Sequence, residues 1–228
     1  MIVVSGASDN HFKSLCNFMN SFLKHRGEHK LIVYNLGITE QMWDSCKERF
    51  INDVDFKIFD YTKYPSWYNI NKEAGQYAWK SAIIKEVYEI YPDEKIVWMD
   101  SGNLIQSLEP LNSFLSQTPI YSAVSSGNIL KWTAPETIKY LNCKDTSKKN
   151  RNAACIGFNT NISYACDMLN DFVKYCAIRE CIAPDGSSRT NHRQDQSVFT
   201  IIYYDYHMKY KYHTEDNFLG YTIHNDVD

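Results

Sequence analysis

The stretch IVWMDSGN, residues 96–103, places an acidic residue directly after four apolar ones. A short apolar run bounded by turn residues is typical of a buried strand. Asp100 would then stand at the carboxyl end of this strand, followed by a turn at Ser101 and Gly102. Ligands of open α/β sheets bind outside the carboxyl ends of the strands. The stretch therefore predicts a buried strand that presents a carboxylate to a ligand site.

Strands and helices alternate around this stretch. Residues 2–5, 31–34 and 54–58 are predicted strands, and residues 12–23 carry apolar side chains at the spacing of one helix face. Repeated strand–helix units imply an α/β fold with a mostly parallel central sheet flanked by helices. Further strands are expected at residues 120–124, 153–158 and 219–223, and further helices at residues 39–50, 79–91, 135–141, 164–181 and 194–204.

Two segments interrupt this alternation. Residues 60–79 are rich in tyrosine and tryptophan, and long loops in compact domains are often functional. They are expected to form a platform or lid over a ligand, although Trp67 and Trp79 could equally belong to the core. Residues 144–152 are polar and basic and are expected to form a mobile loop.

Composition narrows the class of protein. The 228 residues are 44% hydrophobic and 22% charged, which predicts a single globular domain over residues 1–228. A net charge of -3 argues against a nucleic-acid partner. The 7 cysteines include no Cys-x-x-Cys pair, so neither a zinc ribbon nor a disulfide framework is expected. No secretory signal and no transmembrane run is visible, which predicts a cytoplasmic protein, in the host cytoplasm if the source is viral.

Polar clusters follow four of the predicted strands. They are Gly6–Asp9, Asn35–Gly37, Asp100–Asn103 and Asn159. Because the carboxyl ends of parallel strands meet at one edge of a sheet, these clusters should converge on a single site.

Asp100 is the sharpest of these signals. A carboxylate next to an apolar strand is costly to leave without a partner. A divalent cation would supply that partner, since Mg²⁺ and Mn²⁺ take carboxylate and phosphate oxygens as ligands. Alternatively, Asp100 could cap the next turn or pair with Lys80 or Lys95.

The stretch IVWMDSGN resembles the central strand and metal motif of the GT-A-fold glycosyltransferases, the nucleotide-diphospho-sugar transferases that include glycogenin-like enzymes. That family usually carries Asp-x-Asp after the strand, whereas Gly102 stands here in place of the second acid. Further segments resemble family elements in order: VVSGASDNHFKSLCNFMNSF at 3–22, VYNLGIT at 33–39, AWKSAIIKEVYE at 78–89, NAACIGFNTN at 152–161 and HRQDQSVFTII at 192–202. Short bacterial and giant-virus glycosyltransferases show a similar compact layout.

The resemblance implies roles for particular residues. Residues 1–103 would form the nucleotide-binding half and residues 104–228 the sugar and acceptor half. The implied nucleotide-sugar-binding residues are Ser5, Ala7, Ser8, Asp9, Lys80, Asp100, Ser101, Gly102, Asn159, Asp195 and Gln196. The implied metal ligands are Asp100, Asn103 and His224, with His213 as a competitor for the histidine. Asp195 and Asp100 are the implied catalytic residues.

Each of these roles has an ordinary structural alternative. Asp9 and Asp195 could simply cap helices, since aspartate is favoured at helix starts. Lys80 could be a solvated surface lysine rather than a ligand of the diphosphate. His224 could be an exposed residue near the chain end, and His11 a surface residue of the first helical turn.

The resemblance implies transfer of a sugar from a nucleotide-sugar donor, a UDP-sugar in the first place, to a hydroxyl of a glycan or protein acceptor, with Mn²⁺ or Mg²⁺ at Asp100. Asp195 would serve as general base in an inverting reaction or bind the donor sugar in a retaining one. The alternatives are a non-catalytic nucleotide-sugar or carbohydrate-binding module and a sugar nucleotidyltransferase. The nucleotidyltransferase would favour a Gly-rich basic loop near the N-terminus, which residues 6–9 lack.

Overall fold

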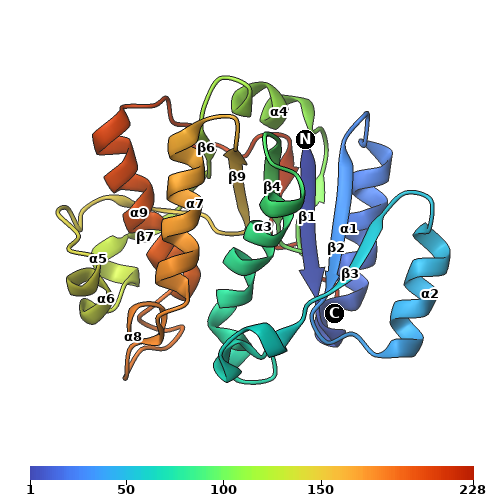
Figure 1. The fold of residues 1–228 in the computed structure, drawn as a ribbon, viewed down its shortest axis with the longest axis horizontal. Helices are drawn as coiled ribbons and strands as arrows, with labels where there is room; N and C mark the ends of the chain where they lie inside the picture. Colours follow the sequence, from blue (N-terminus) through green and yellow to red (C-terminus); the bar gives the residue numbers. More distant parts are fainter.

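A six-stranded sheet forms the centre of the molecule (Figure 1). The computed structural model describes all of residues 1–228. The strand order is β3-β2-β1-β4-β9-β6, formed by Asp55–Ile58, Lys30–Asn35, Ile2–Ala7, Lys95–Met99, Cys155–Asn159 and Ile120–Tyr121. The first four strands in this order are parallel to one another, while β9 is antiparallel to both of its neighbours. The predicted α/β fold with a mostly parallel sheet is confirmed.

Helices cover both faces of the sheet because successive strand residues point to opposite faces. In β1, Val4 packs into a cluster of 32 buried residues and Val3 into a cluster of 23 on the other face. The larger cluster includes side chains of α3 (Ala78–Ile90), α7 (Ser163–Cys176) and α9 (Gln194–Tyr210). The smaller one includes side chains of α1 (Phe12–Lys24), α2 (Glu40–Phe50) and α4 (Glu109–Leu115).

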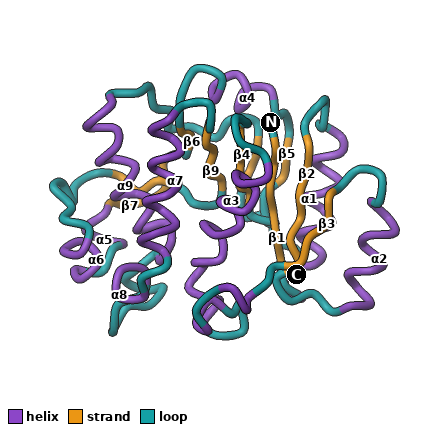
Figure 2. Tube along the Cα trace, viewed as in Figure 1, coloured by secondary structure: helices purple, strands orange, loops and turns teal.

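Short elements complete the chain (Figure 2). Two-stranded sheets pair β5 (Leu104–Ile105) with β10 (Tyr221–Thr222), and β7 (Val124–Asn128) with β8 (Lys149–Arg151). The short helices are η1 (Asp9–His11), η2 (Tyr61–Lys63), η3 (Ser66–Tyr68), η4 (Glu73–Tyr77), α5 (Ile129–Trp132), α6 (Pro135–Tyr140) and α8 (Arg179–Ile182). None of the helices combines the length and apolar character needed to span a lipid bilayer.

The structure corrects three sequence expectations. Residues 144–152 are not loop throughout, because β8 pairs with β7 there. The helix expected over 164–181 is two helices, separated where Ile178 adopts an extended conformation at φ −104° and ψ 109°. Asp9 does not cap α1. Its first backbone N–H groups, at Lys13 and Ser14, donate instead to the carboxylate of Asp228.

Candidate functional site

A cavity of about 820 Å³ opens at the carboxyl ends of β1, β2 and β4. In Figures 1 and 2 the C-terminus lies beside the same end of β1. The loops after the three parallel strands line one side of the cavity, and the starts of α3 and α9 line the other. The predicted convergence of strand ends is therefore observed for three of the four clusters.

A buried lysine links two carboxylates in this cavity. The Nζ of Lys80 lies 3.1 Å from Asp100 Oδ1 and 3.1 Å from Asp195 Oδ2, and it donates to the carbonyl oxygen of Ala153 at 2.9 Å. Trp98 Nε1 donates to the same Asp100 oxygen at 2.6 Å. Only 4% of the Lys80 side chain and 6% of the Asp195 side chain are exposed, against 41% for Asp100. Lys80 is therefore not the solvated lysine of the alternative reading.

Burial and charge act in opposite directions on this cluster. Burial alone would lower the pKa of Lys80, but the charges of Asp100 and Asp195 outweigh it and hold the pKa above its ordinary value. Burial raises the pKa of Asp195 to about 6, although the ammonium of Lys80 opposes that rise. At neutral pH the formal charge of the three groups is one negative unit, which suits a cation or a hydroxyl donor as ligand.

The turns after β1 and β2 are tied together beside the cluster. Asp9 Oδ1 accepts a hydrogen bond from the backbone N–H of Thr39 at 2.7 Å. Asn35 Oδ1 accepts from the backbone N–H groups of Gly37 and Ile38 at 2.7 and 2.6 Å, an arrangement in which an asparagine side chain closes its own turn. Asp9 thus braces two loops rather than capping a helix.

A left-handed turn forms the cavity wall before α3. All five residues of Glu73–Tyr77 have φ between 50° and 58°, a conformation that costs a non-glycine residue roughly 1–2 kcal/mol. Trp79 Nε1 donates to the carbonyl oxygen of Ala74 at 3.0 Å and so fixes the turn onto α3. Strained backbone of this kind is concentrated at functional sites, and Ala74 and Tyr77 line the cavity.

Eleven of the predicted site residues line the cavity. They are Ala7, Ser8, Asp9, Lys80, Asp100, Ser101, Gly102, Asn103, Asp195, Gln196 and His224. His213 does not line it and packs instead against Phe114, with ring centroids 5.7 Å apart.

Two predicted site residues lie elsewhere. Asn159 is at the opposite edge of the sheet, because β9 is antiparallel to β4 and pairs Asn159 with Lys95 at the start of β4. Its amide donates to the carbonyl oxygen of Leu115 at 2.8 Å. Ser5 lies inside β1 with no exposed surface and does not line the cavity.

The aromatic segment also differs from expectation. Most of its rings pack inward: Tyr68 is 1% exposed and stacks on Tyr64 at 5.1 Å, which in turn stacks on Phe59 at 5.0 Å. The residues of this segment that line the cavity are Ile70, Asn71, Ala74, Tyr77 and Trp79, of which only the last two are aromatic. The expected platform or lid is therefore largely core.

Several residues that line the cavity were not among the site residues predicted from the sequence. Residues 152–154, which precede β9, reach the cavity because that strand runs antiparallel. Asp226 also lines it, and a Cβ atom on Gly102 would meet the Asp226 carboxylate at 2.5 Å. The backbone N–H of Asn225 donates to the Gly102 carbonyl oxygen at 2.8 Å, which fixes this approach. No local pattern marks a residue 124 positions further along the chain as a neighbour of Gly102.

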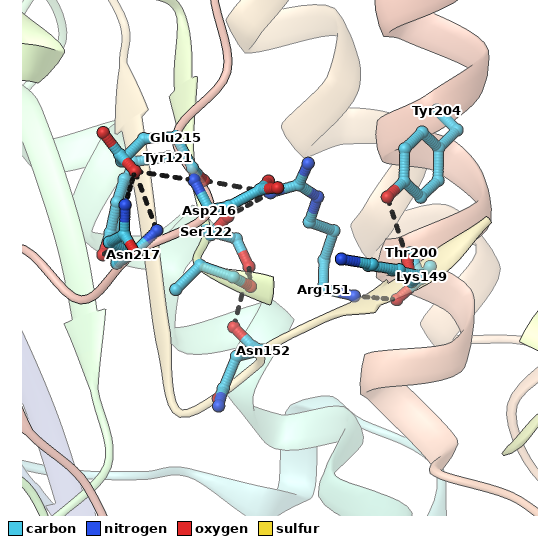
Figure 3. Close-up of polar contacts among 11 residues, drawn as sticks. Tyr121, Ser122, Lys149, Arg151, Asn152, Thr200, Tyr204, Glu215, Asp216 and Asn217 are labelled. Atoms are coloured by element: carbon cyan, nitrogen blue, oxygen red, sulfur yellow. Dashed lines mark hydrogen bonds and ion pairs between the residues drawn. The ribbon is translucent and has the colours of Figure 1, made fainter. Parts of the chain in front are cut away.

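A buried arginine, Arg151, is the centre of a polar network beside β7 (Figure 3). Arg151 Nη1 donates to the carbonyl oxygens of Ser122 and Glu215 at 3.0 Å and lies 3.0 Å from Asp216 Oδ1. Its guanidinium carbon is 4.5 Å from the centre of the Tyr203 ring. The network joins β8, the segment after β6 and the chain before β10 to α9.

Metal-binding capacity is limited to oxygen donors from separate segments. No group of three or more His, Cys, Asp or Glu side chains is arranged to hold a metal ion. Asp100 uses Oδ1 for Trp98 and Lys80, which leaves Oδ2 without a hydrogen bond from the protein. Asn103 commits its amide nitrogen to the Ala154 carbonyl oxygen at 2.8 Å. The Asp226 carboxylate occupies the space that the missing side chain of Gly102 leaves open. A cation at this wall would meet the free oxygen of Asp100 and the Asp226 carboxylate, and would need further oxygen ligands from a bound molecule.

Comparison of the sequence with known proteins gives one partial match. A model of a family described as a protein of unknown function (DUF1647) matches residues 1–85. No curated protein matches the sequence.

Three solved structures are similar in fold. Galactosyltransferase LgtC, in complex with donor and acceptor sugar analogues, has a TM-score of 0.54 and 16% identity over 87% of this chain and 69% of its own. The WbbM bifunctional glycosyltransferase has a TM-score of 0.60 and 15% identity over 90% of this chain and 37% of its own. Mouse xyloside xylosyltransferase 1 has a TM-score of 0.51 and 12% identity over 94% of this chain and 83% of its own. The chain therefore adopts the GT-A fold of the nucleotide-diphospho-sugar transferases, as its sequence resemblance predicts.

Proposed function

We propose that the chain is a glycosyltransferase that moves a sugar from a nucleotide-sugar donor, a UDP-sugar in the first place, to a hydroxyl of a glycan or protein acceptor. The observation that carries this proposal is the cluster of Lys80, Asp100 and Asp195 in the cavity at the strand ends. Residues 1–103 would bind the nucleotide, chiefly through the braced turns after β1 and β2. Residues 104–228 would bind the sugar and the acceptor.

In this reaction the bond between the anomeric carbon and the diphosphate oxygen breaks, and the acceptor oxygen takes its place. Asp195, when ionised, can accept a hydrogen bond from a donor-sugar hydroxyl or take the proton of the acceptor hydroxyl. Lys80 acts as a positioning residue, since its ammonium is already committed to two carboxylates and a carbonyl.

A divalent cation fits the other side of the cluster. Asp100 Oδ2 and the Asp226 carboxylate would hold Mn²⁺ or Mg²⁺, with His224 and Asn103 nearby on the cavity wall. When bound, the metal would offset the negative charge of the leaving diphosphate. The Asp226 carboxylate then stands for the second acid that Gly102 replaces in the motif.

One observation favours a second candidate, a non-catalytic nucleotide-sugar-binding module. The Asp100 oxygen nearest Lys80 is already occupied by two donors, and the sequence lacks the second acid of the usual motif. Such a module would bind the donor without turning it over.

The test measures binding and turnover separately. UDP, GDP and CDP, each with and without Mn²⁺, are screened for the rise in melting temperature that a ligand of the native state produces. UDP-sugars are then followed for release of free sugar and for transfer to glycan acceptors. We expect a metal-dependent rise with UDP and slow hydrolysis of at least one UDP-sugar. Binding without turnover selects the binding module, and the absence of any nucleotide binding contradicts both.

The variant Asp195→Asn keeps the shape of the side chain and removes its charge. We expect it to bind UDP as the wild type does and to lose at least a hundredfold in turnover, in the range typical of a lost general base or transition-state contact. The matched control is Asp185→Asn, an exposed acid outside the cavity. Determining the anomeric configuration of the product by NMR then separates the two roles of Asp195, since a general base at that position implies inversion.

A further inference from the structure

Two arginines occupy the wall of the cavity formed by residues 132 and 189–193. The guanidinium carbon of Arg193 lies 4.1 Å from the centre of the Trp132 ring, and that of Arg189 lies 6.0 Å from the centre of the Tyr77 ring. All four residues line the cavity. Tyr77 belongs to the aromatic segment that was expected to form a platform, whereas Trp132, Arg189 and Arg193 are absent from the site implied by the sequence. The Lys80 cluster uses none of the four.

Neither guanidinium forms an ion pair or a side-chain hydrogen bond within the protein. No carboxylate lies within the 4.0 Å of an ion pair from either side chain, and neither donates a side-chain hydrogen bond. By contrast, Arg26 pairs with Asp53 at 2.6 Å and Arg151 with Asp216 at 3.0 Å. A guanidinium stacked on an aromatic ring keeps its N–H groups in a planar fork that points outward from its edge. Such a fork matches the two oxygens of a carboxylate or a phosphate.

Hydrogen bonds and close packing fix the position of Trp132, the residue against which Arg193 stacks. The carbonyl oxygen of Trp132 accepts from the Arg193 backbone N–H at 3.1 Å and from Ser197 Oγ at 2.7 Å. A Cβ atom on Gly127 would come within 2.5 Å of Trp132 Nε1, so the ring is also held from the side of β7. The fully buried ring of His192 accepts from the Ala134 backbone N–H at 3.1 Å through Nδ1 and contacts the Ile182 carbonyl oxygen through Nε2. The chain therefore fixes Arg193 at this wall before any ligand binds.

The charges of the cavity are separated along its walls. Lys80, Asp100 and Asp195 together carry one negative charge at the strand ends. The remaining acids of the lining, Asp9 and Asp226, belong to the turn after β1 and to the chain beside Gly102. The cationic wall at Arg189 and Arg193 contains no acid that would offset it.

We infer that the acceptor is an anionic glycan and that Arg189 and Arg193 bind its carboxylate. This inference rests on the proposed function, because it assigns one part of the cavity to the acceptor and the Asp100 part to the donor. It names a substrate class, glycans that carry carboxylate groups, rather than a particular sugar or linkage.

The test compares two acceptor probes that differ only in charge. One is an unsulfated chondroitin hexasaccharide, and the other is the same hexasaccharide with its carboxyl groups reduced to neutral hydroxymethyl groups. Binding of each is measured by calorimetry to the protein saturated with UDP and Mn²⁺, and again without them. We expect the acidic hexasaccharide to bind at least about tenfold more tightly, as charge-assisted bidentate hydrogen bonds would produce.

Three variants separate the possible sources of this difference. Arg189→Gln/Arg193→Gln should abolish the preference for the acidic probe while the rise in melting temperature with UDP stays unchanged. If the double variant does not fold, Arg189→Gln alone serves in its place, because it changes an exposed side chain. The single variant should reduce the preference for the acidic probe. Arg179→Gln removes the same charge from an exposed position outside the cavity and should change neither.

Two results overturn the inference. Equal binding, or no binding, of the two hexasaccharides by the wild type shows that the arginines do not recognise an acidic glycan. Loss of UDP binding in the double variant shows that they hold the donor diphosphate instead. Failure of UDP to bind the wild type contradicts the proposed function but leaves the comparison of the two hexasaccharides readable, so the two failures are distinguishable.

Discussion

The buried ammonium of Lys80 joins the buried carboxylate of Asp195 to the partly exposed carboxylate of Asp100. Removing one partner of a buried ion pair typically costs about 3–5 kcal/mol, because the remaining charge loses its compensation. We expect Lys80→Met to lower the free energy of unfolding by roughly 3 kcal/mol and to abolish turnover, since Asp195 would then favour its neutral form. Urea denaturation measures the first effect. The matched control is Lys85→Met in the same helix, whose partly exposed pair with Glu89 contributes only about 0.3–0.5 kcal/mol. Equal losses in the two variants would contradict the role of Lys80.

The pH dependence of turnover should report Asp195. Burial raises the pKa of this carboxyl to about 6, so the group becomes neutral as the pH falls through that value. Both proposed roles of Asp195 require the ionised form. Turnover should therefore fall below a pH of about 6 and level off above it. Asp195→Asn should remove this dependence from the residual activity, whereas a limb that persists unchanged would assign the titration to another group.

The sequence predicted much of the site at this scale, for a physical reason. Asp100 could be identified because a carboxylate directly after four apolar residues must find a partner. The alternative that paired it with Lys80 was also correct, although it is not exclusive of a ligand site. Asp226 and Arg189 could not be identified, because their roles depend on contacts across the fold that leave no local pattern.

The left-handed turn Glu73–Tyr77, which forms part of the cavity wall, depends on a glycine at position 75. Gly75 has φ +58°, and a Cβ atom there would lie 2.1 Å from the carbonyl oxygen of Tyr68. Gly27 has a similar φ of +52° with nothing within 4 Å of a Cβ atom. Gly27→Ala should therefore cost only the conformational term of roughly 1 kcal/mol, while Gly75→Ala should cost clearly more and weaken UDP-sugar binding. Urea denaturation measures the free energy of unfolding of both variants, and the difference between their losses is the steric contribution at Gly75. Equal losses would show that the turn relaxes freely around the added methyl group.

The network around Arg151 joins elements that are distant in sequence (Figure 3). Arg151→Met would leave the carbonyl oxygens of Ser122 and Glu215 without their donor, at about 1–3 kcal/mol for a buried polar group. Asp216→Asn removes only the charged partner, which is 57% exposed, and should cost less than about 1 kcal/mol. Thermal unfolding of both variants measures the difference. A larger loss in Asp216→Asn would show that the ion pair, rather than the carbonyl contacts, stabilises the network.

Helices and strands could be predicted from the sequence where the spacing of apolar residues alone determines them. The alternation of strands and helices over residues 2–58 follows from apolar periodicity, and the structure confirms it. The direction of β9 was not predictable, because an apolar run reads the same in a parallel and an antiparallel strand. For this reason Asn159 was predicted at the edge of the sheet that holds the site, whereas it lies at the opposite edge. Residues 152–154, which line the cavity, were not predicted.

At the scale of the whole molecule, the sheet is shared by two buried clusters of 32 and 23 residues. Both clusters pack on the same central strands, so these strands cannot open without disrupting both. The central strands should therefore exchange their amide hydrogens only on global unfolding. The cavity is bordered instead by short segments: the turn after β1, the turn Glu73–Tyr77 and the chain from His224 to Asp226. These segments have few ladder hydrogen bonds and should open locally at lower cost.

Hydrogen exchange with and without UDP and Mn²⁺ should therefore show two kinds of protection. At one hundred times its dissociation constant a ligand stabilises the native state by about 2.7 kcal/mol, which slows globally exchanging amides of β1 and β4 roughly a hundredfold. The three bordering segments should gain protection at lower ligand concentration, because contact suppresses their local opening directly. A smaller hollow of about 200 Å³ at the other edge of the sheet, lined by Arg26, Lys30 and Tyr91, is the internal control. Protection that begins there would place the nucleotide at the amino ends of β2 and β3 and contradict the site at the carboxyl ends.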